Sequence, residues 1–301
     1  SYQVYNNIVA QNSTTRAVQE THGILLETAQ GDPAETFYYS TSCGGGSDAN
    51  VWKTEAAQAI DYLKAKSISE SSVSAGSGRI DSENGENSGN EVADGVMEQE
   101  IGETLRDEKN FREFITGSNP DNFEVDEGWY RWTYQVKKLS PEYMYQVLKA
   151  RYKANPELVL TKGKKDYVSE EPKEFQTVKN LYIAVRGSGG VADELIIETD
   201  KATYKVITEH NIRYVLCDGE TKVKRAKGND VEMPNLLPSG FFVLDAIQKD
   251  QNVVGYKLIG GGFGHGVGMS QNAAKTMALK GYSCEEILTF FYDGCKLADI
   301  Y

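Results

Sequence analysis

The side chains best suited to chemistry concentrate in one glycine-rich stretch near the C-terminus, Gly260-Gly261-Gly262-Phe263-Gly264-His265-Gly266-Val267-Gly268-Met269-Ser270-Gln271. Glycine is used where φ must be positive, or where another backbone or a ligand comes close. A strand over residues 256–259 leads into this stretch, and a helix is expected to begin near Val267. Free N–H groups at such a helix start can bind an anion or a polar sugar group. His265 is therefore either a structural hydrogen-bonder in a close-packed turn or part of a substrate cleft.

A second polar, glycine-rich turn lies in the first quarter of the chain and reads Ser40-Thr41-Ser42-Cys43-Gly44-Gly45-Gly46-Ser47. It precedes an aromatic residue, Trp52. One interpretation is a plain loop. The other is a second wall of the cleft, which presents hydroxyl groups and an aromatic ring.

These two stretches carry a resemblance to a known family. The sequence from Gly264 to Gln271, with the residues that follow it, closely resembles the end of the stage II sporulation protein D (SpoIID/LytB-like) family. The following matches are Ala274, Met277-Ala278, Gly281-Tyr282 and Glu286-Ile287-Leu288. The N-terminal matches are Gln3, Tyr5, Thr21, Gly23, Ser40-Thr41, Gly44-Gly45, Trp52 and Tyr62-Leu63. The resemblance covers residues 1–64 and about 178–301 and is thin between them.

The resemblance implies a role at the bacterial cell wall. Members of the family cut the glycan strands of peptidoglycan as lytic transglycosylases or modulate cell-wall amidases. It implies an extracytoplasmic, wall-facing location, with peptidoglycan glycan strands and a cell-wall amidase as the expected partners. A non-catalytic glycan-binding module or amidase enhancer is the alternative. The expected substrate-binding residues are Gln3, Tyr5, Ser40, Thr41, Trp52, His265, Ser270 and Gln271.

The catalytic residue stays unknown. The family's acid is a glutamate in a Glu-Met-Pro segment before the Gln-x-Tyr strand, and this chain begins at that strand, so the acid is expected upstream of Ser1. Glu232 lies in a Glu-Met-Pro string, but a polar stretch surrounds it and the family's helix does not follow. We interpret that string as chance. The other glutamates are expected mostly on acidic or helical surfaces, where their pKa is too low for a proton donor at neutral pH.

No metal or other cofactor is expected. Some family members bind zinc through a His-Cys pair before the Gln-x-Tyr strand and a second His or Cys near the Ser-Thr turn. Here only Cys43 remains, and one thiolate cannot form the usual four-ligand site. Cys284 and Cys295 flank a short helix and are either disulfide-bonded or free thiols.

The amino-acid composition argues against two further classes of interaction, with nucleic acid and across a membrane. The chain has 301 residues, a net charge of −12 and a mean hydropathy of −0.49. An acidic balance argues against nucleic acid, whose phosphates require clustered Lys and Arg. No apolar run approaches the ~18 residues that span a bilayer, and no signal peptide is visible.

Helix-period and strand-period segments alternate without a parallel βαβ rhythm, which predicts an α+β fold of antiparallel strands and short helices with a polar insertion. The predicted parts are two core segments, 1–64 and 178–301, a flexible acidic Ser/Gly-rich insertion, 65–95, and a segment with a helix and an aromatic strand, 96–177. The expected helices are 14–23, 96–116, one opening at Ser140-Pro141, and 208–216. The expected strands are the hairpin 24–28/34–41, the aromatic strand 128–134, the meander 178–186/194–198/202–206 and the hairpin 241–247/253–259.

Overall fold

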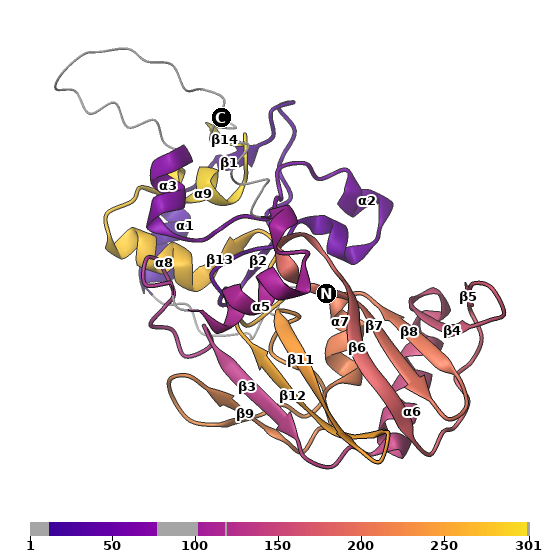
Figure 1. Cartoon of the computed structure of the whole chain (residues 1–301). Coiled ribbons are helices and arrows are strands. Elements are labelled where there is room, and N and C mark those ends of the chain that lie inside the picture. Colours follow the sequence, from indigo (N-terminus) through magenta and orange to yellow (C-terminus); the bar gives the residue numbers. More distant parts are fainter. Residues whose placement is uncertain (1–11, 77–101, 118, 300–301) are drawn as a thin grey trace. The chain divides into compact units, whose positions relative to one another are not determined.

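The computed structural model describes residues 12–76, 102–117 and 119–299, which fall into two units (Figure 1). The smaller unit joins residues up to Glu35 with those from Gly294 onward. It contains helix α1 (Asn12–Glu20) and an antiparallel pair of strands, β1 (Ile24–Glu27) and β14 (Lys296–Asp299). The larger unit, Thr36–Asp293, holds all other described elements.

Two five-stranded antiparallel sheets form most of the larger unit (Figure 1). The first sheet has the order β10-β9-β3-β12-β11 and the second has the order β5-β4-β8-β7-β6. The strands of the first are β3 (Trp132–Val136), β9 (Lys222–Arg225), β10 (Val231–Glu232), β11 (Phe242–Lys249) and β12 (Asn252–Gly260). The strands of the second are β4 (Val159–Lys162), β5 (Tyr167–Val168), β6 (Val178–Arg186), β7 (Ala192–Thr199) and β8 (Thr203–Ile207).

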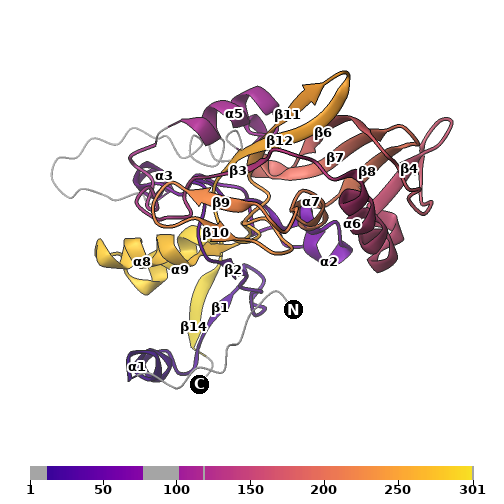
Figure 2. The ribbon, with the colours of Figure 1, turned by 90° about the horizontal axis from the view of Figure 1, so that it is seen from below.

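The main core contains the buried faces of both sheets and of two helices. In β3 every second residue is buried, which is the period of a strand with one face in the core. Helices α6 (Pro141–Ala154) and α7 (Glu209–Val215) lie on one side of the second sheet (Figure 2). Residues buried in this core include Trp132, Tyr134, Leu148, Leu195, Tyr204, Ile212, Phe242, Tyr256 and Leu258.

Short elements surround the two glycine-rich turns. The helices here are α2 (Glu55–Gln58), α3 (Glu70–Gly76), α5 (Glu108–Thr116), α8 (Gln271–Leu279) and α9 (Cys284–Phe291). A two-stranded parallel ladder joins β2 (Tyr38–Tyr39) to β13 (Met269–Ser270). The 3-10 turns η1 (Ala49–Trp52) and η3 (Ser188–Gly190) also lie here, whereas η2 (Pro156–Leu158) lies between α6 and β4.

The α+β fold class is confirmed, and so are the elements that local sequence specifies. The Ser140 hydroxyl caps α6 by accepting from the Tyr143 N–H at 3.2 Å, as the Ser-Pro pair predicted. The meander β6–β7–β8, helix α7 and the hairpin β11–β12 lie within a few residues of their expected positions.

Three expected elements differ from the structure. The predicted hairpin 24–28/34–41 forms only at its turn, where the Ala34 N–H donates to the Leu26 carbonyl and the Thr28 N–H to the Asp32 carbonyl, both at 2.8 Å. Beyond the turn the two segments do not pair with each other, because β1 pairs with β14 and β2 pairs with β13. The predicted helix 96–116 is not continuous: in its described part, a helical turn over 102–104 ends before α5 begins at Glu108. Helix α8 begins at Gln271 rather than near Val267, because the glycine-rich segment forms turns and short β-bridges before it.

The insertion that we expected at residues 65–95 does not begin at residue 65. Ala65, Ile68 and Ser69 are buried, and the Ile68 N–H donates to the Gly44 carbonyl at 3.0 Å. Residues 65–69 are therefore packed parts of the larger unit. Residues 70–76 form helix α3, and the part of the predicted insertion from residue 77 to 95 lies outside the described residues.

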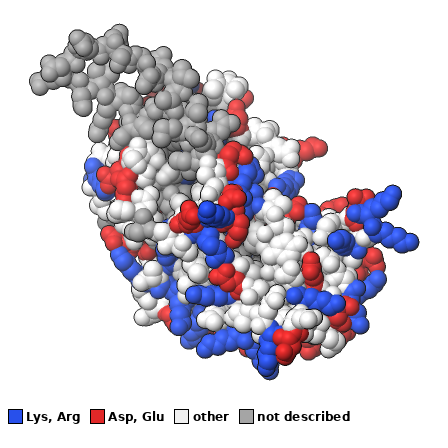
Figure 3. All heavy atoms as spheres, in the orientation of Figure 1, with Lys and Arg blue, Asp and Glu red and all other residues white. Residues whose placement is uncertain are grey.

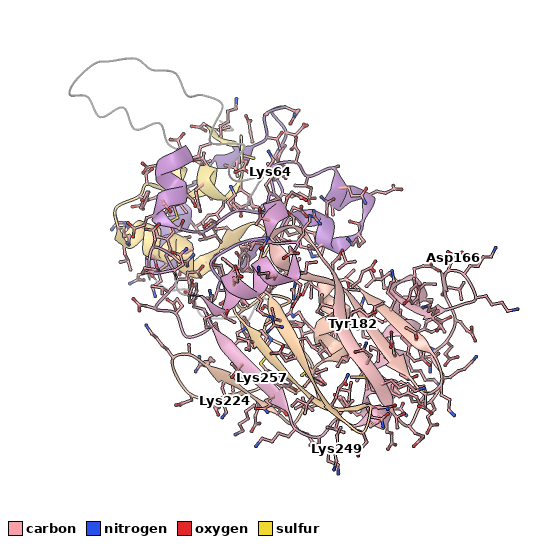
Figure 4. The ribbon with its side chains drawn as sticks, viewed as in Figure 1. Lys64, Asp166, Tyr182, Lys224, Lys249 and Lys257 are labelled. Carbon is pink, nitrogen blue, oxygen red and sulfur yellow. The ribbon has the colours of Figure 1, made fainter. Side chains whose placement is uncertain are left out.

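Charge is distributed unevenly over the surface. On the face shown in Figure 3, Lys and Arg side chains gather along the lower rim. In Figure 4, Lys224, Lys257 and Lys249 lie there, on β9, β12 and β11. The net charge of −12 therefore does not describe this face. In the part of the chain that the structure describes, no helix is long and apolar enough to cross a membrane.

Candidate functional site

The glycine-rich segment adopts a left-handed backbone conformation that favours glycine. Gly262, Gly264, Gly266 and Gly268 all have positive φ, from 75° to 115°. A Cβ on Gly268 would overlap the carbonyl oxygen of Phe37. The backbone thus runs against β2, and the prediction that these glycines are backbone requirements is confirmed.

The two glycine-rich turns lie side by side, as the sequence analysis expected. Thr41 and Phe263 exchange backbone hydrogen bonds at 2.8 and 3.2 Å, and the Ser47 N–H donates to the Gly266 carbonyl at 2.8 Å. The Asn272 side-chain amide donates to the Thr41 hydroxyl at 2.9 Å, and the Asn272 N–H donates to the Ser40 carbonyl at 3.1 Å. We call these segments, residues 39–47 and 262–272, the two walls.

Backbone N–H groups of the second wall are not free to hold an anion. Those of Phe263, Gly264, Val267, Met269 and Asn272 all donate within the protein. The expectation of a helix-start anion seat is therefore wrong for these groups. These five N–H groups therefore do not contact a ligand in this conformation.

The expected binding residues divide by exposure. Thr41 is 1% exposed and Ser270 is fully buried, so in this conformation no ligand contacts their side chains. Ser40, Trp52 and His265 are half-buried, and Gln271 is exposed. Gln3 and Tyr5 lie outside the described residues.

His265 stands in an aromatic environment at the bend. Its ring centre is 5.5 Å from that of Trp52 and 5.8 Å from that of Tyr39, and Trp52 also packs edge-on against Phe37 at 4.7 Å. Burial, together with the nearby Arg213 cation, lowers the pKa of His265 to about 4, while the Tyr38 carbonyl acts in the opposite direction. The imidazole is therefore neutral near pH 7.

The hydrogen bonds of His265 fix its tautomer. Nδ1 accepts from the Val267 N–H at 3.2 Å, so the ring proton resides on Nε2. Nε2 is buried and has no hydrogen-bond partner of ordinary geometry among the described residues. This ring is a neutral donor next to a tryptophan face.

A buried acid that sequence reasoning missed connects the two walls. Glu124 is fully buried, contrary to the expectation that the glutamates lie mostly on surfaces. Its carboxyl accepts from the Ser42 N–H at 3.1 Å, from the Ser42 hydroxyl, and from the Ser270 hydroxyl at 2.7 Å. Ser270 precedes α8 at its N-cap position, but its side chain makes no cap hydrogen bond.

Burial changes the acidity of this carboxyl. Desolvation raises the pKa of Glu124 to about 7, with a smaller contribution from Glu127, although the hydrogen bonds from Ser42 and Ser270 act in the opposite direction. No periodic pattern marked Glu124, since it lies in a turn rather than in a helix or strand. The only available signal was its position between two apolar residues, Phe123 and Val125.

Glu232 behaves as the sequence analysis expected. It lies on β10, its side chain is 72% exposed, and it pairs with Lys222 at 3.0 Å. It therefore lacks the apolar surroundings that a proton donor at neutral pH requires.

The remaining groups offer no metal site. Cys43 is fully buried, and burial raises its thiol pKa to about 11. Cys284 and Cys295 form no disulfide. Within residues 12–76, 102–117 and 119–299, no three His, Cys, Asp or Glu side chains lie close enough together to hold a metal ion.

A cavity lies away from the two walls. It has a volume of about 440 Å³ and lies between α6, α7 and the first sheet. Its lining includes Tyr143, Asp218 and Asn235. The Asp218 carboxylate is already occupied by the Tyr134 hydroxyl and by the N–H and hydroxyl of Thr221. These hydrogen bonds stabilise the turn around Asp218. The cavity can therefore serve as a control region in binding experiments at the walls.

Comparison with known proteins gives a family without an assigned activity. No curated protein matches the chain. The model of a family described as "Domain of unknown function (DUF8618)" matches residues 50–268, which include Trp52, Glu124 and His265. Because this match extends over well over half of the sequence, the chain belongs to the DUF8618 family.

Proposed function

We propose that this chain acts on the glycan strands of peptidoglycan and supplies the substrate-binding walls of a SpoIID-like lytic transglycosylase. The proposal places the protein on the extracytoplasmic, wall-facing side of the membrane, where its substrate lies. It rests on the sequence resemblance of the two walls to that family and on their close association in the structure.

The observation that carries the proposal is the pairing of the Ser-Thr turn with the glycine-rich turn. The β2–β13 ladder and the bridge between Thr41 and Phe263 connect segments more than 200 residues apart in sequence. Folding thereby collects Ser40, Trp52, His265 and Gln271, none of them fully buried, on adjoining segments. These are hydroxyl, aromatic, imidazole and amide groups.

Such groups suit a glycan of N-acetylated sugars. Sugar hydroxyls both donate and accept hydrogen bonds, and the Ser40 hydroxyl and Gln271 amide can do the same. An aromatic ring packs against the apolar face of a sugar while its polar edge stays hydrated. The neutral His265 ring adds no charge and packs against Trp52, but its Nε2 is buried, so in this conformation it supports the aromatic surface rather than donating to a sugar.

Cleavage also requires an acid that reaches the glycosidic oxygen. Glu124 has the appropriate pKa but is fully buried, and Glu232 is exposed to water. Within the proposal, the described residues bind the glycan and the acid comes from residues outside them. The burial of Glu124 also favours a second candidate function, a glycan-binding module or amidase enhancer that does not cut.

The proposal is tested by titrating the 301-residue chain with purified glycan strands that lack stem peptides. Saturable binding is expected, because the walls are preformed. Trp52→Ala removes an aromatic face and is expected to weaken binding roughly tenfold, about the effect of one well-packed aromatic contact. The matched control is Tyr143→Ala, which removes a 37%-exposed ring from the remote cavity and should leave binding unchanged.

Product analysis separates the two candidate functions. Mass spectrometry for anhydro-muramyl ends should show none after incubation with the 301-residue chain, because the acid is not among the described binding groups. Anhydro ends produced by this chain would overturn that assignment. Absence of glycan binding, or equal loss in Trp52→Ala and Tyr143→Ala, would overturn the proposed function itself.

A further inference from the structure

Glu124 connects three parts of the chain that are far apart in sequence. It lies 82 residues from Ser42 and 146 residues from Ser270, and it accepts hydrogen bonds from both. Its own turn is held in place because the Glu124 N–H donates to the Asn122 side chain at 3.0 Å. The Asn122 amide in turn donates to the Ile68 carbonyl at 2.6 Å. The carboxyl is thus presented to both walls from a third, fixed segment.

Each wall depends on one of these serines. In the first wall, the Ser42 hydroxyl accepts from the Gly44 N–H at 3.1 Å, so Ser42 also shapes the turn that follows it. In the second wall, Ser270 immediately precedes α8, whose Asn272 holds Thr41 and Ser40. A carboxyl that fixes Ser42 and Ser270 therefore fixes the spacing of the exposed groups on both walls.

Two other roles for Glu124 fit the structure poorly. A proton donor must reach the substrate, but this side chain is fully buried and both serines that contact it are at most 1% exposed. A simple core residue would be apolar, since a buried carboxyl has a desolvation cost that a leucine does not. The retained carboxyl, with hydrogen-bond donors at both oxygens, is explained by a requirement for a defined wall geometry.

We propose that Glu124 is the positioning residue of the candidate site: its carboxyl joins Ser42 to Ser270 and sets the separation of the two walls. The consequence for glycan binding rests on the function proposed above. The joining of the two walls does not rest on that function, because it is a property of the protein without ligand.

The titratable groups around the Glu124 carboxyl decide at which pH its role should be measured. Tyr39, Cys43 and Tyr130 face it from the first wall and from the turn before β3, and burial raises the pKa of each. Arg131 stacks on Tyr130 and donates to the Cys43 carbonyl at 2.7 Å. Glu127, half-buried on the same turn, is the neighbouring acid. Measurements at pH 6 and pH 8 therefore bracket the titration of Glu124 while the tyrosines stay neutral.

The test is amide hydrogen exchange without ligand, on wild type, Glu124→Ala, Glu124→Gln and the matched control Glu127→Gln. In Glu124→Ala, the amides of residues 42–47 and 270–274 are expected to exchange roughly tenfold faster or more, as expected for lost hydrogen bonds to a carboxylate. Glu124→Gln keeps one acceptor oxygen and should restore part of the protection. Glu127→Gln should match wild type, and strands β6, β7 and β8 should be unchanged in every variant.

A double-mutant cycle keeps the proposal falsifiable if Glu124→Ala is globally unstable. Ser270→Ala removes one donor to the carboxyl. Its effect on exchange at residues 42–47 should be smaller in the Glu124→Gln background than in wild type if the carboxyl transmits it. Equal effects in both backgrounds, or faster exchange spread evenly over the molecule, would show that Glu124 does not position the walls.

Glycan titration of the same variants separates this proposal from the proposed function. Wild type should bind glycan strands, Glu124→Ala roughly tenfold more weakly, and Glu124→Gln with intermediate affinity. If wild type does not bind glycan but the exchange results hold, the proposed function fails and the positioning role stands. If glycan binds equally well to all variants, the positioning role fails and the glycan function stands.

Discussion

Glu124 and His265 respond to pH in opposite directions. The folded-state pKa of Glu124, about 7, lies above its ordinary value of 4.5, so the folded chain binds more protons than the unfolded chain between these values. Its contribution to stability is complete below about pH 4.5 and is lost as the pH rises through 7. The pKa of His265, about 4, lies below 6.5, so its contribution is complete above 6.5 and is lost as the pH falls through 4.

Replacing Glu124 should separate these two effects. Comparison of wild type with Glu124→Gln cancels the histidine contributions, and the variant should gain stability relative to wild type by roughly 2–3 kcal/mol between pH 4.5 and 7.5. Urea denaturation across this range measures the difference, and Glu127→Gln provides the control. A difference that stays constant with pH would contradict the raised pKa.

At the scale of single residues, the accessible binding candidates were easier to predict from the sequence than the roles of the buried residues. Ser40, Trp52, His265 and Gln271 have the half-buried or exposed positions that ligand contact requires. Sequence could not show that Ser270 would be turned inward, because that depends on the buried acid opposite it. Glu124 itself carries no periodic signal, and only its tertiary contacts reveal it.

Elements defined by neighbouring residues were predicted well, and elements paired across the chain were not. The cap of α6 and the β11–β12 hairpin depend on residues within a few positions of one another. Strands β1 and β2 are short, and their partners β14 and β13 lie more than 200 residues away. The local turn between residues 28 and 32 forms, but beyond it the strands pair with these distant partners instead of with each other.

The glycine-rich wall can be tested as an element by two matched substitutions. Gly268 (φ 75°) and Gly281 (φ 91°) both have positive φ, but only Gly268 has backbone against its missing Cβ. Gly281→Ala should cost about 1 kcal/mol, the strain of the left-handed conformation. Gly268→Ala should cost about 3 kcal/mol or more, since the Phe37 carbonyl must also move. Equal losses in denaturation experiments would remove the close approach as the reason for glycine at this position.

At the scale of the whole molecule, the sequence predicted the α+β class but not the arrangement of its parts. The order of the two five-stranded sheets depends on pairings such as β3 with β12 and β9, which join segments far apart in the sequence. Ala65 and Ile68 were assigned to a solvated insertion because the composition changes near them, yet they are buried. Average composition over a window does not resolve single buried positions.

The DUF8618 match covers most of the candidate site but not all of it. The matched region contains Glu124, Trp52 and His265 but ends at Gly268, before Ser270. The positioning acid and the aromatic pair therefore lie inside the family's domain, and the serine that completes the carboxyl's contacts lies just beyond the match.

The central claim is that the two walls bind glycan, and a ligand footprint tests it most directly. Amide hydrogen exchange of the 301-residue chain is measured with and without peptide-free glycan strands. The account predicts slower exchange on glycan addition in residues 40–47 and 262–272, with little change around the remote cavity at Tyr143 and Asp218. Protection confined to that cavity, or no protection at the walls under saturating glycan, would contradict it.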